Sequence, residues 1–209
     1  VAKVNARKPE NTRLLLISPA PEPINSTLKI QQEKSTRSLL PFIANTSRHL
    51  LYLRNGSEIS GETLKRGKGF KSYCDAHGVY CETLNLGDDF DLVRGKASVE
   101  DVLRNFIISA RKTGKMRYDG IYTSTDLLAK ALLEQLQFLG VEVPEEVQLV
   151  GHDGMQWMNS GKYLVSTIVQ PVPDMARKAV ELLLKKIKGE EIETLTILPV
   201  EFAEGGTTR

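Results

Sequence analysis

The sequence lacks long apolar runs and a surplus of charge of either sign. None of its apolar runs approaches the roughly 20 residues that a membrane-spanning helix requires. The basic N-terminal segment VAKVNARKPENTR contains no apolar core of the kind found in signal peptides. Lysine and arginine (28 residues) nearly balance aspartate and glutamate (26 residues), for a formal net charge of +2, whereas nucleic-acid surfaces need clustered positive charge. We therefore expect a soluble, cytoplasmic protein that makes no membrane contact.

The sequence also has little that could carry catalysis or bind a metal. Cys74 and Cys81, the only cysteines, lack companions at metal-ligand spacing, and we interpret them as reduced structural thiols. The three histidines, His49, His77 and His152, are too far apart in sequence for a local metal site. No nucleophile elbow, zinc-protease helix motif, phosphate-binding loop or paired-cysteine redox motif is present. We expect no metal, no cofactor, no catalytic residue and no enzymatic activity.

Short apolar stretches alternate with amphipathic ones along most of the chain. LLLIS at 14–18 is a continuous apolar run typical of a buried parallel strand, and Gly78 is a typical helix stop. The expected strands are 14–18, 24–30, 49–53, 79–86, 120–125, 147–152, 165–170 and 194–202, and the expected helices are 33–43, 61–77, one that opens at Ser98, 126–139 and 173–188. This alternation predicts an α/β fold of parallel sheets flanked by helices.

The segment from Gly120 to Gly154 carries most of the functional information. In GIYTSTD a strand ends in hydroxyl residues and Asp126, and in QLVGHDG the next strand ends in Asp153. Because open α/β sheets bind small ligands at the carboxyl ends of their strands, these residues are candidates for ligand contact. Plainer interpretations remain open: Asp126 stabilises a helix N-terminus, and Asp153 forms a turn with Gly154.

Four stretches, in order along the chain, resemble the effector-binding domain of the lactose/galactose repressor family. They are LLLISPAPEPINSTL, SRHLLYLRNGSEISGETLKRGKGF, YDGIYTSTDLLAKALLEQLQFLGVEVPEEVQLVGHDG and STIVQPVPDMARKAVELLLKKIKGE. The second contains the family's R-x-x-G-F helix opening. In the third, VGHD resembles the family's V-G-F/Y-D strand end, and in the fourth, STIVQ resembles its T-T-I/V-x-Q strand. Each motif is loose alone, but together they cover almost the whole chain from Asn11.

The resemblance implies the type I periplasmic-binding-protein fold, with two lobes of which the first is incomplete. It divides the chain into a remnant of the N-terminal subdomain (1–30), the C-terminal effector-binding subdomain (31–168), a segment returning to the N-terminal subdomain (169–190), and a closing strand and tail of the C-terminal subdomain (191–209). In relatives, three strands, three helices and a helix-turn-helix headpiece would precede the position of Val1. We expect this chain to be part of a longer repressor and to bind ligand poorly by itself.

The resemblance also implies which residues contact an effector. It matches Arg66 to the family's effector-contacting arginine and Asp153 to its effector-binding acid, although Arg66 alone resembles a solvated helix residue. The remaining candidates are Ser57, Ser60, Phe90, Thr125 and Asp126, for which turn, core or capping roles stay open. His152 stands where the family usually has an aromatic residue, and we interpret it as structural. These candidates predict that segments 57–66, 125–126 and 152–153 meet in one crevice.

The resulting hypothesis is a sensor that binds a sugar or sugar phosphate between two lobes and couples this binding to operator affinity. By resemblance its partners would be a second copy of the chain and, through the absent headpiece, operator DNA. The leucines of helix 126–139 would contribute to the homodimer interface, and a purely internal role for them stays open. The alternative hypothesis is a sugar-binding protein of a transport system with the same fold. An enzyme on such a sheet is the weakest hypothesis.

Overall fold

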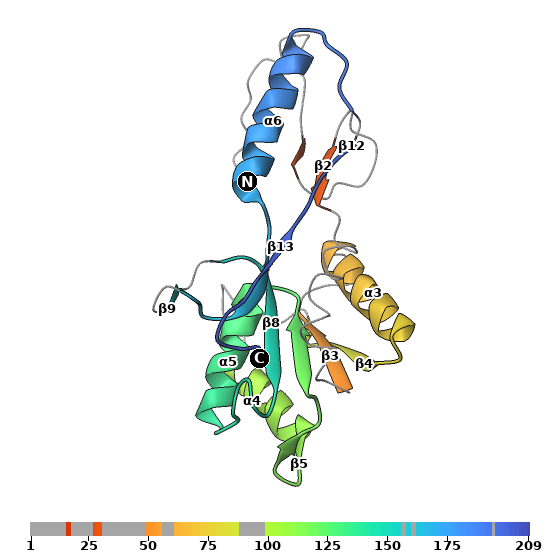
Figure 1. Cartoon of the computed structure of the whole chain (residues 1–209). Helices are drawn as coiled ribbons and strands as arrows, with labels where there is room; N and C mark the ends of the chain where they lie inside the picture. Colours follow the sequence, from red (N-terminus) through yellow and green to blue (C-terminus); the bar gives the residue numbers. More distant parts are fainter. Residues whose placement is uncertain are drawn as a thin grey trace. The chain divides into compact units, whose positions relative to one another are not determined.

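The computed structural model describes residues 16–17, 27–30, 49–55, 61–87, 99–155, 158–159, 162–193 and 195–209. The chain divides into two compact units (Figure 1). Unit 1 comprises Val1–Ile30 and Pro171–Leu198, and unit 2 comprises Gln31–Gln170 and Pro199–Arg209. Among the described residues, no helix is both long and apolar enough to cross a membrane.

Unit 2 is built around a six-stranded sheet in the order β13-β11-β8-β7-β3-β4. Its strands are β3 (His49–Arg54), β4 (Tyr80–Asn85), β7 (Gly120–Thr123), β8 (Gln148–Asp153), β11 (Ser166–Val169) and β13 (Glu201–Ala203). All neighbouring pairs are parallel except β11 with β13. β3, β7 and β8 lie inside the sheet and are almost entirely buried, and the run Leu50–Leu53 of β3 is apolar as expected for such a strand.

Helices cover both faces of this sheet, with α3 (Gly61–Ala76) on one face and α4 (Val99–Ala110) and α5 (Asp126–Phe138) on the other (Figure 1). Successive side chains of β3 alternate between the two cores: Tyr52 packs with Phe70 of α3, whereas Leu53 packs with the cluster of α4 and α5. The α5 leucines that fill this second cluster are Leu128, Leu132, Leu133 and Leu136. Most of the leucine-rich helix therefore faces its own core.

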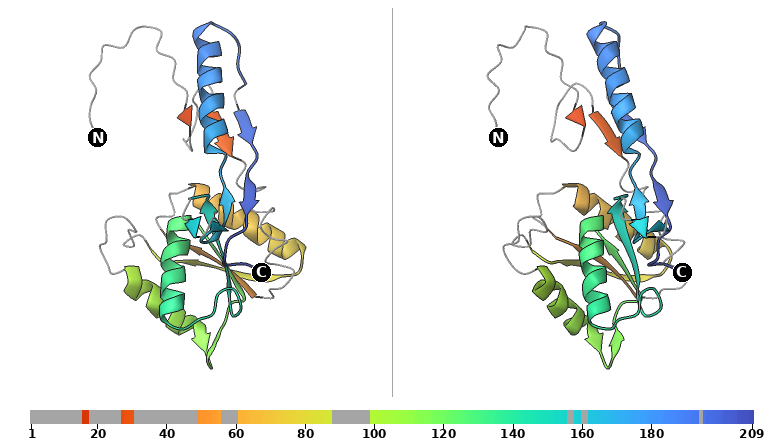
Figure 2. Two further views of the ribbon diagram at one scale, coloured as in Figure 1. Left: turned by 60° about the vertical axis from the view of Figure 1, so that its left-hand side comes forward. Right: turned by 90° about the vertical axis from the view of Figure 1, so that its left-hand side faces the viewer.

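Unit 1 contains a small parallel sheet and one helix, which Figure 2 shows together with unit 2 in two further views. The sheet has the order β1-β2-β12, with β1 (Leu16–Ile17), β2 (Thr27–Ile30) and β12 (Leu195–Leu198). The helix is α6 (Val172–Ile187), whose buried residues are Ala179 and Leu182. Large apolar side chains of α6 are exposed at Val172, Val180, Leu184 and Ile187.

The prediction of one closing strand at 194–202 is wrong. β12 pairs with β2 in unit 1, and β13 pairs with β11 in unit 2. Pro199 separates the two strands and has no N–H group to donate to a sheet. The chain therefore returns to unit 2 at Pro199, and residues 191–198, predicted for the C-terminal subdomain, lie in unit 1.

The other described elements lie where the sequence indicates, within a few residues at their ends. α3 ends at Ala76 before Gly78, and the predicted helix 126–139 is α5. Two short antiparallel hairpins were not predicted: β5 (Arg111–Lys112) with β6 (Lys115–Met116), and β9 (Met158–Asn159) with β10 (Lys162–Tyr163). The predicted helix 33–43 lies outside the described residues.

Candidate functional site

Arg66 and Asp153 meet at the carboxyl end of the six-stranded sheet. Arg66 lies in the second turn of α3 and is buried, and Asp153 is the last residue of β8. Nη2 of Arg66 donates to Oδ1 of Asp153 over 3.3 Å, and Nη1 donates to the backbone oxygen of Ser124, directly after β7. The planar guanidinium therefore connects α3 to the ends of two strands, as its fixed fork of donors allows.

One oxygen of the Asp153 carboxylate is held from two sides, while the other faces no hydrogen-bond donor among the described residues. Oδ1 accepts from Nε2 of Gln170 over 2.6 Å as well as from Arg66. Desolvation raises the pKa of Asp153, and the charge of Arg66 and the hydrogen bond from Gln170 oppose that rise. The side chain is 31% exposed. A fixed, partly exposed carboxylate oxygen of this kind can accept hydrogen bonds from ligand hydroxyl groups.

The backbone at this strand end is unusual. Asp153 has φ of 115°, a region that non-glycine residues rarely occupy, and Gly154 has φ of 78°. A Cβ atom on Gly154 would lie 2.8 Å from Cα of Val169, so this position also lacks space for a side chain. Strained residues of this kind persist where the surrounding contacts hold them, and they are concentrated at ligand sites.

Asp126 lies nearby but is enclosed by protein. Its side chain is 1% exposed, and it accepts hydrogen bonds from the Thr167 hydroxyl and from the backbone N–H of Met155, both over 2.6 Å. Desolvation raises the pKa of Asp126 to about 6, against the lowering effect of these hydrogen bonds. The carboxylate thus fixes the chain that follows β8, which is a structural task at the edge of the site.

Thr125 caps the helix that Asp126 opens. Its side-chain oxygen accepts from the backbone N–H of Leu128 over 3.3 Å, in the extended conformation typical of an N-cap. The residue is only half-buried, and its hydroxyl hydrogen is not needed for this cap.

Buried aromatic side chains underlie the site on the face covered by α3. The rings of Tyr52, Phe70 and Tyr122 pack with centroids 5.2–6.1 Å apart. His152 is fully buried among them, and its Nδ1 forms a 2.7 Å hydrogen bond with the Tyr122 hydroxyl. Burial, with a further contribution from the charge of Arg66, holds the pKa of His152 well below its usual value, so the ring is neutral. This placement agrees with the structural interpretation of His152.

The structure therefore brings two of the predicted site residues, Arg66 and Asp153, into direct contact, with Thr125 and Asp126 at the neighbouring strand end. Ser57, Ser60 and Phe90 lie outside the described residues. Two contributors were not predicted as site residues: Ser124 and Gln170. The STIVQ motif contained Gln170, whereas Ser124 takes part through its backbone, which no side-chain pattern signals.

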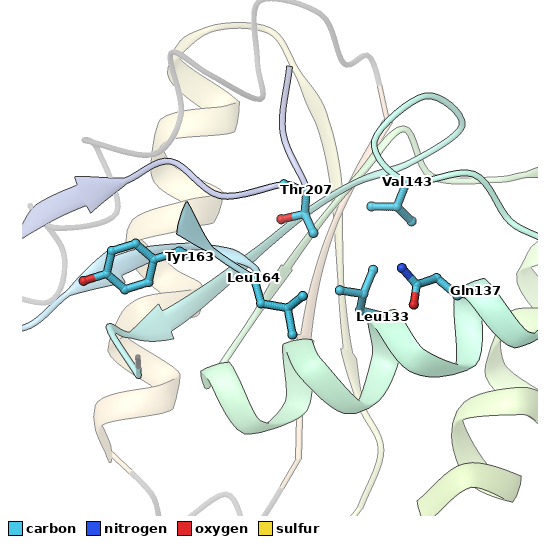
Figure 3. A pocket seen from close by; sticks show the side chains of 7 residues that line it. Leu133, Gln137, Val143, Tyr163, Leu164 and Thr207 are labelled. Carbon is cyan, nitrogen blue, oxygen red and sulfur yellow. The ribbon is translucent and has the colours of Figure 1, made fainter. Parts of the chain in front are cut away.

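A separate cavity of about 290 Å³ lies between α5 and the C-terminal segment (Figure 3). Its lining residues are Leu133, Gln137, Val143, Tyr163, Leu164, Gly206 and Thr207, and none of the predicted site residues is among them. Within the described ranges, no group of three or more His, Cys, Asp or Glu side chains could hold a metal ion.

Comparison with known proteins identifies a family for most of the chain. Residues 42–208 match the family described as "Periplasmic binding protein-like domain". The sucrose operon repressor of Streptococcus mutans is 26% identical over 157 residues, which cover 75% of this chain and 45% of the repressor. The ribose operon repressor of Bacillus subtilis is 37% identical over 92 residues, which cover 44% of this chain and 28% of the repressor. The matches thus span less than half the length of these relatives.

A solved structure shows the same fold. The periplasmic binding protein/LacI transcriptional regulator from Alkaliphilus metalliredigens, complexed with D-xylulofuranose, superposes with a TM-score of 0.71 at 24% identity, covering 93% of this chain and 70% of that protein. The fold class and the resemblance predicted from the sequence are confirmed. The chain belongs to the family of periplasmic binding protein-like domains.

Proposed function

We propose that this chain is the ligand-sensing part of a transcriptional repressor and binds a sugar or sugar phosphate at the carboxyl end of the six-stranded sheet. The arrangement of Asp153 is the main support: Arg66 and Gln170 fix one carboxylate oxygen, and the other lacks a described donor. Open α/β sheets bind ligands at this edge. The named relatives are repressors of sugar operons, so a transport protein is the less supported alternative.

The effector would act by favouring one conformation of the repressor over another. Hydroxyl groups of a sugar would donate to Asp153, and Arg66 would contact the sugar without losing its hydrogen bond to the Ser124 carbonyl. Binding shifts an equilibrium only by its difference in affinity for the two states. We propose that this difference is coupled to operator affinity in the cytoplasm, and that the protein senses its ligand without converting it.

We further propose that the repressor works as a homodimer. Large apolar side chains on the outer surfaces of α4 and α5 support this proposal, because Ile108 and Phe138 are both exposed and Phe138 is 71% so. Analytical ultracentrifugation of the whole gene product tests it. We expect a dimer that Ile108→Glu weakens, whereas a monomer in the unsubstituted protein at micromolar concentration would contradict the proposal.

A thermal-shift screen of the whole gene product against neutral sugars and sugar phosphates tests ligand sensing. We expect one of these compounds to raise Tm, and Arg66→Ala and Asp153→Ala each to abolish that shift. Asp75→Ala is the matched control, because Asp75 lies exposed on α3 and pairs with Lys71. The same shift in both site variants would place the ligand elsewhere.

A further inference from the structure

Arg54 is a buried cation for which the described residues supply no counterion. It is the last residue of β3 and is 5% exposed. Its Nη1 has no hydrogen-bond partner among the described residues, and no described carboxylate pairs with the side chain. A guanidinium stays charged at any physiological pH, and a buried charge without a partner is costly. Such a group is therefore expected to have a function that offsets its cost.

The position of Arg54 places it at the candidate site. Side chains alternate along β3, so Arg54 shares the face of Tyr52, which α3 covers. The Tyr52 hydroxyl donates to the backbone oxygen of Thr63 in the first turn of α3, one turn before Arg66. Burial raises the pKa of Tyr52, and the charges of Arg66 and then Arg54 oppose that rise. Both guanidinium groups thus lie close enough to act on one hydroxyl.

The charges around this hydroxyl do not cancel. The carboxylate of Asp153 also acts on Tyr52, and it is already paired with Arg66. Within the described part of the chain, Arg54 therefore remains a positive charge without a compensating carboxylate at the carboxyl end of the sheet. A phosphate or carboxylate group would both neutralise it and accept its fork of N–H donors, which a neutral hydroxyl group cannot do equally well.

We propose that Arg54 binds an anionic group of the effector, so that the effector is a phosphorylated or acidic sugar and not a neutral one. This proposal rests on the proposed function. It assigns separate tasks to the two arginines: Arg66 orients Asp153 toward sugar hydroxyls, and Arg54 selects for negative charge. Arg54 occurs in the stretch YLRNGS, where sequence patterns alone show an ordinary polar residue after a strand.

The test is isothermal titration calorimetry of the whole gene product with sugar phosphates, sugar acids, the parent neutral sugars and inorganic phosphate. We expect a sugar phosphate or a sugar acid to bind at least tenfold more tightly than its neutral parent and than inorganic phosphate. Arg54→Met should weaken that binding about 10- to 100-fold, in line with the strength of charged hydrogen bonds. Arg54→Lys, which keeps the charge but loses the fork, should weaken it less. Arg104→Met on α4 is the control and should bind as the unsubstituted protein does.

Stability provides a second measurement. Since Arg54→Met removes a buried charge that has no partner in the described ranges, its Tm without ligand should equal or exceed that of the unsubstituted protein. A large drop in Tm would show a structural role for Arg54 and would contradict the proposal. Preferential binding of a neutral sugar, unaffected by Arg54→Lys, would overturn the anionic effector and leave the proposed function intact. Failure of every sugar, neutral or charged, to bind would overturn both.

Discussion

The guanidinium of Arg66 donates a 3.3 Å hydrogen bond to the carboxylate of Asp153, 87 positions away in the sequence. The same guanidinium also donates to the backbone oxygen of Ser124. Oδ1 of Asp153 also accepts from Gln170, so residues from α3, β8, the end of β7 and the end of β11 are fixed to one another. The site is thereby organised before any ligand arrives, which lowers the entropic cost of binding.

We expect Arg66→Lys to destabilise unit 2 and to impair ligand binding. A single ammonium cannot reproduce the planar fork that donates to both the Ser124 oxygen and Asp153. Leaving the acceptor at the buried Ser124 unsatisfied costs about 1–3 kcal/mol in the free energy of unfolding. Urea denaturation followed by circular dichroism measures this loss. Lys68→Arg, at an exposed position of α3, is the control, and an equal effect of both substitutions would contradict the prediction.

Much of unit 2 could be predicted from the sequence because its strands are short, apolar and regularly separated by amphipathic helices. Asp153 could be selected as a candidate for ligand contact from its place after a buried strand, because open α/β sheets bind ligands at the carboxyl ends of their strands. Arg66 was not, because its neighbours Lys65 and Lys68 make it resemble surface charge. Only its resemblance to a family motif distinguished it.

The sequence could not show which sheet a strand joins. The apolar pattern runs from Leu195 through Phe202, yet β12 pairs with β2 and β13 with β11. Strand pairing is a contact between residues distant in sequence, and periodicity describes only local order. For the same reason the task of Asp126 was left open, because its partner Thr167 lies 41 residues away.

We expect Gly151→Ala to destabilise the protein. A Cβ atom at this position of β8 would lie 2.0 Å from Oδ1 of Asp126 and 3.2 Å from Cβ of Ala129. Either the carboxylate loses its hydrogen bond from Thr167 or α5 moves away from the sheet, at a cost of about 1–3 kcal/mol. Chemical denaturation measures the change. Gly206→Ala is the matched control because its nearest contact would be 3.7 Å, and an unaffected Gly151→Ala protein would contradict the close approach.

Asp126 should make the protein less stable as the pH rises from about 4 to about 6. Its pKa in the folded protein is about 6, against an unperturbed value of 3.8, so in this window the folded state retains a proton that the unfolded state has lost. This raised pKa corresponds to a loss of about 3 kcal/mol in the free energy of unfolding at pH above 6.

Asp126→Asn removes this titration. The variant should therefore gain stability relative to the unsubstituted protein as the pH rises through that window, whatever constant offset its altered hydrogen bonds introduce. Urea titrations at several pH values measure the difference, and Asp75→Asn, exposed on α3, controls for the substitution itself. A difference that is independent of pH would show that the folded protein does not hold the Asp126 proton.

His152 should contribute a pH dependence of the opposite sign. Its burial keeps the ring neutral in the folded protein, with a pKa well below the unperturbed value of 6.5. Below pH 6.5 the unfolded chain binds a proton that the folded protein does not, so the free energy of unfolding falls as the pH decreases.

His152→Phe removes the titrating group together with a buried nitrogen, Nε2, that has no partner among the described residues. It also removes the hydrogen bond to the Tyr122 hydroxyl, a loss that does not vary with pH in this range. We therefore expect the variant to gain stability relative to the unsubstituted protein between pH 7.5 and pH 5, measured by urea denaturation with His77→Phe as the control. Parallel stability curves for His152→Phe and the unsubstituted protein would mean that the folded protein accommodates a charged imidazolium beside Arg66, and the buried aromatic cluster beneath the site would then have to open at mildly acidic pH.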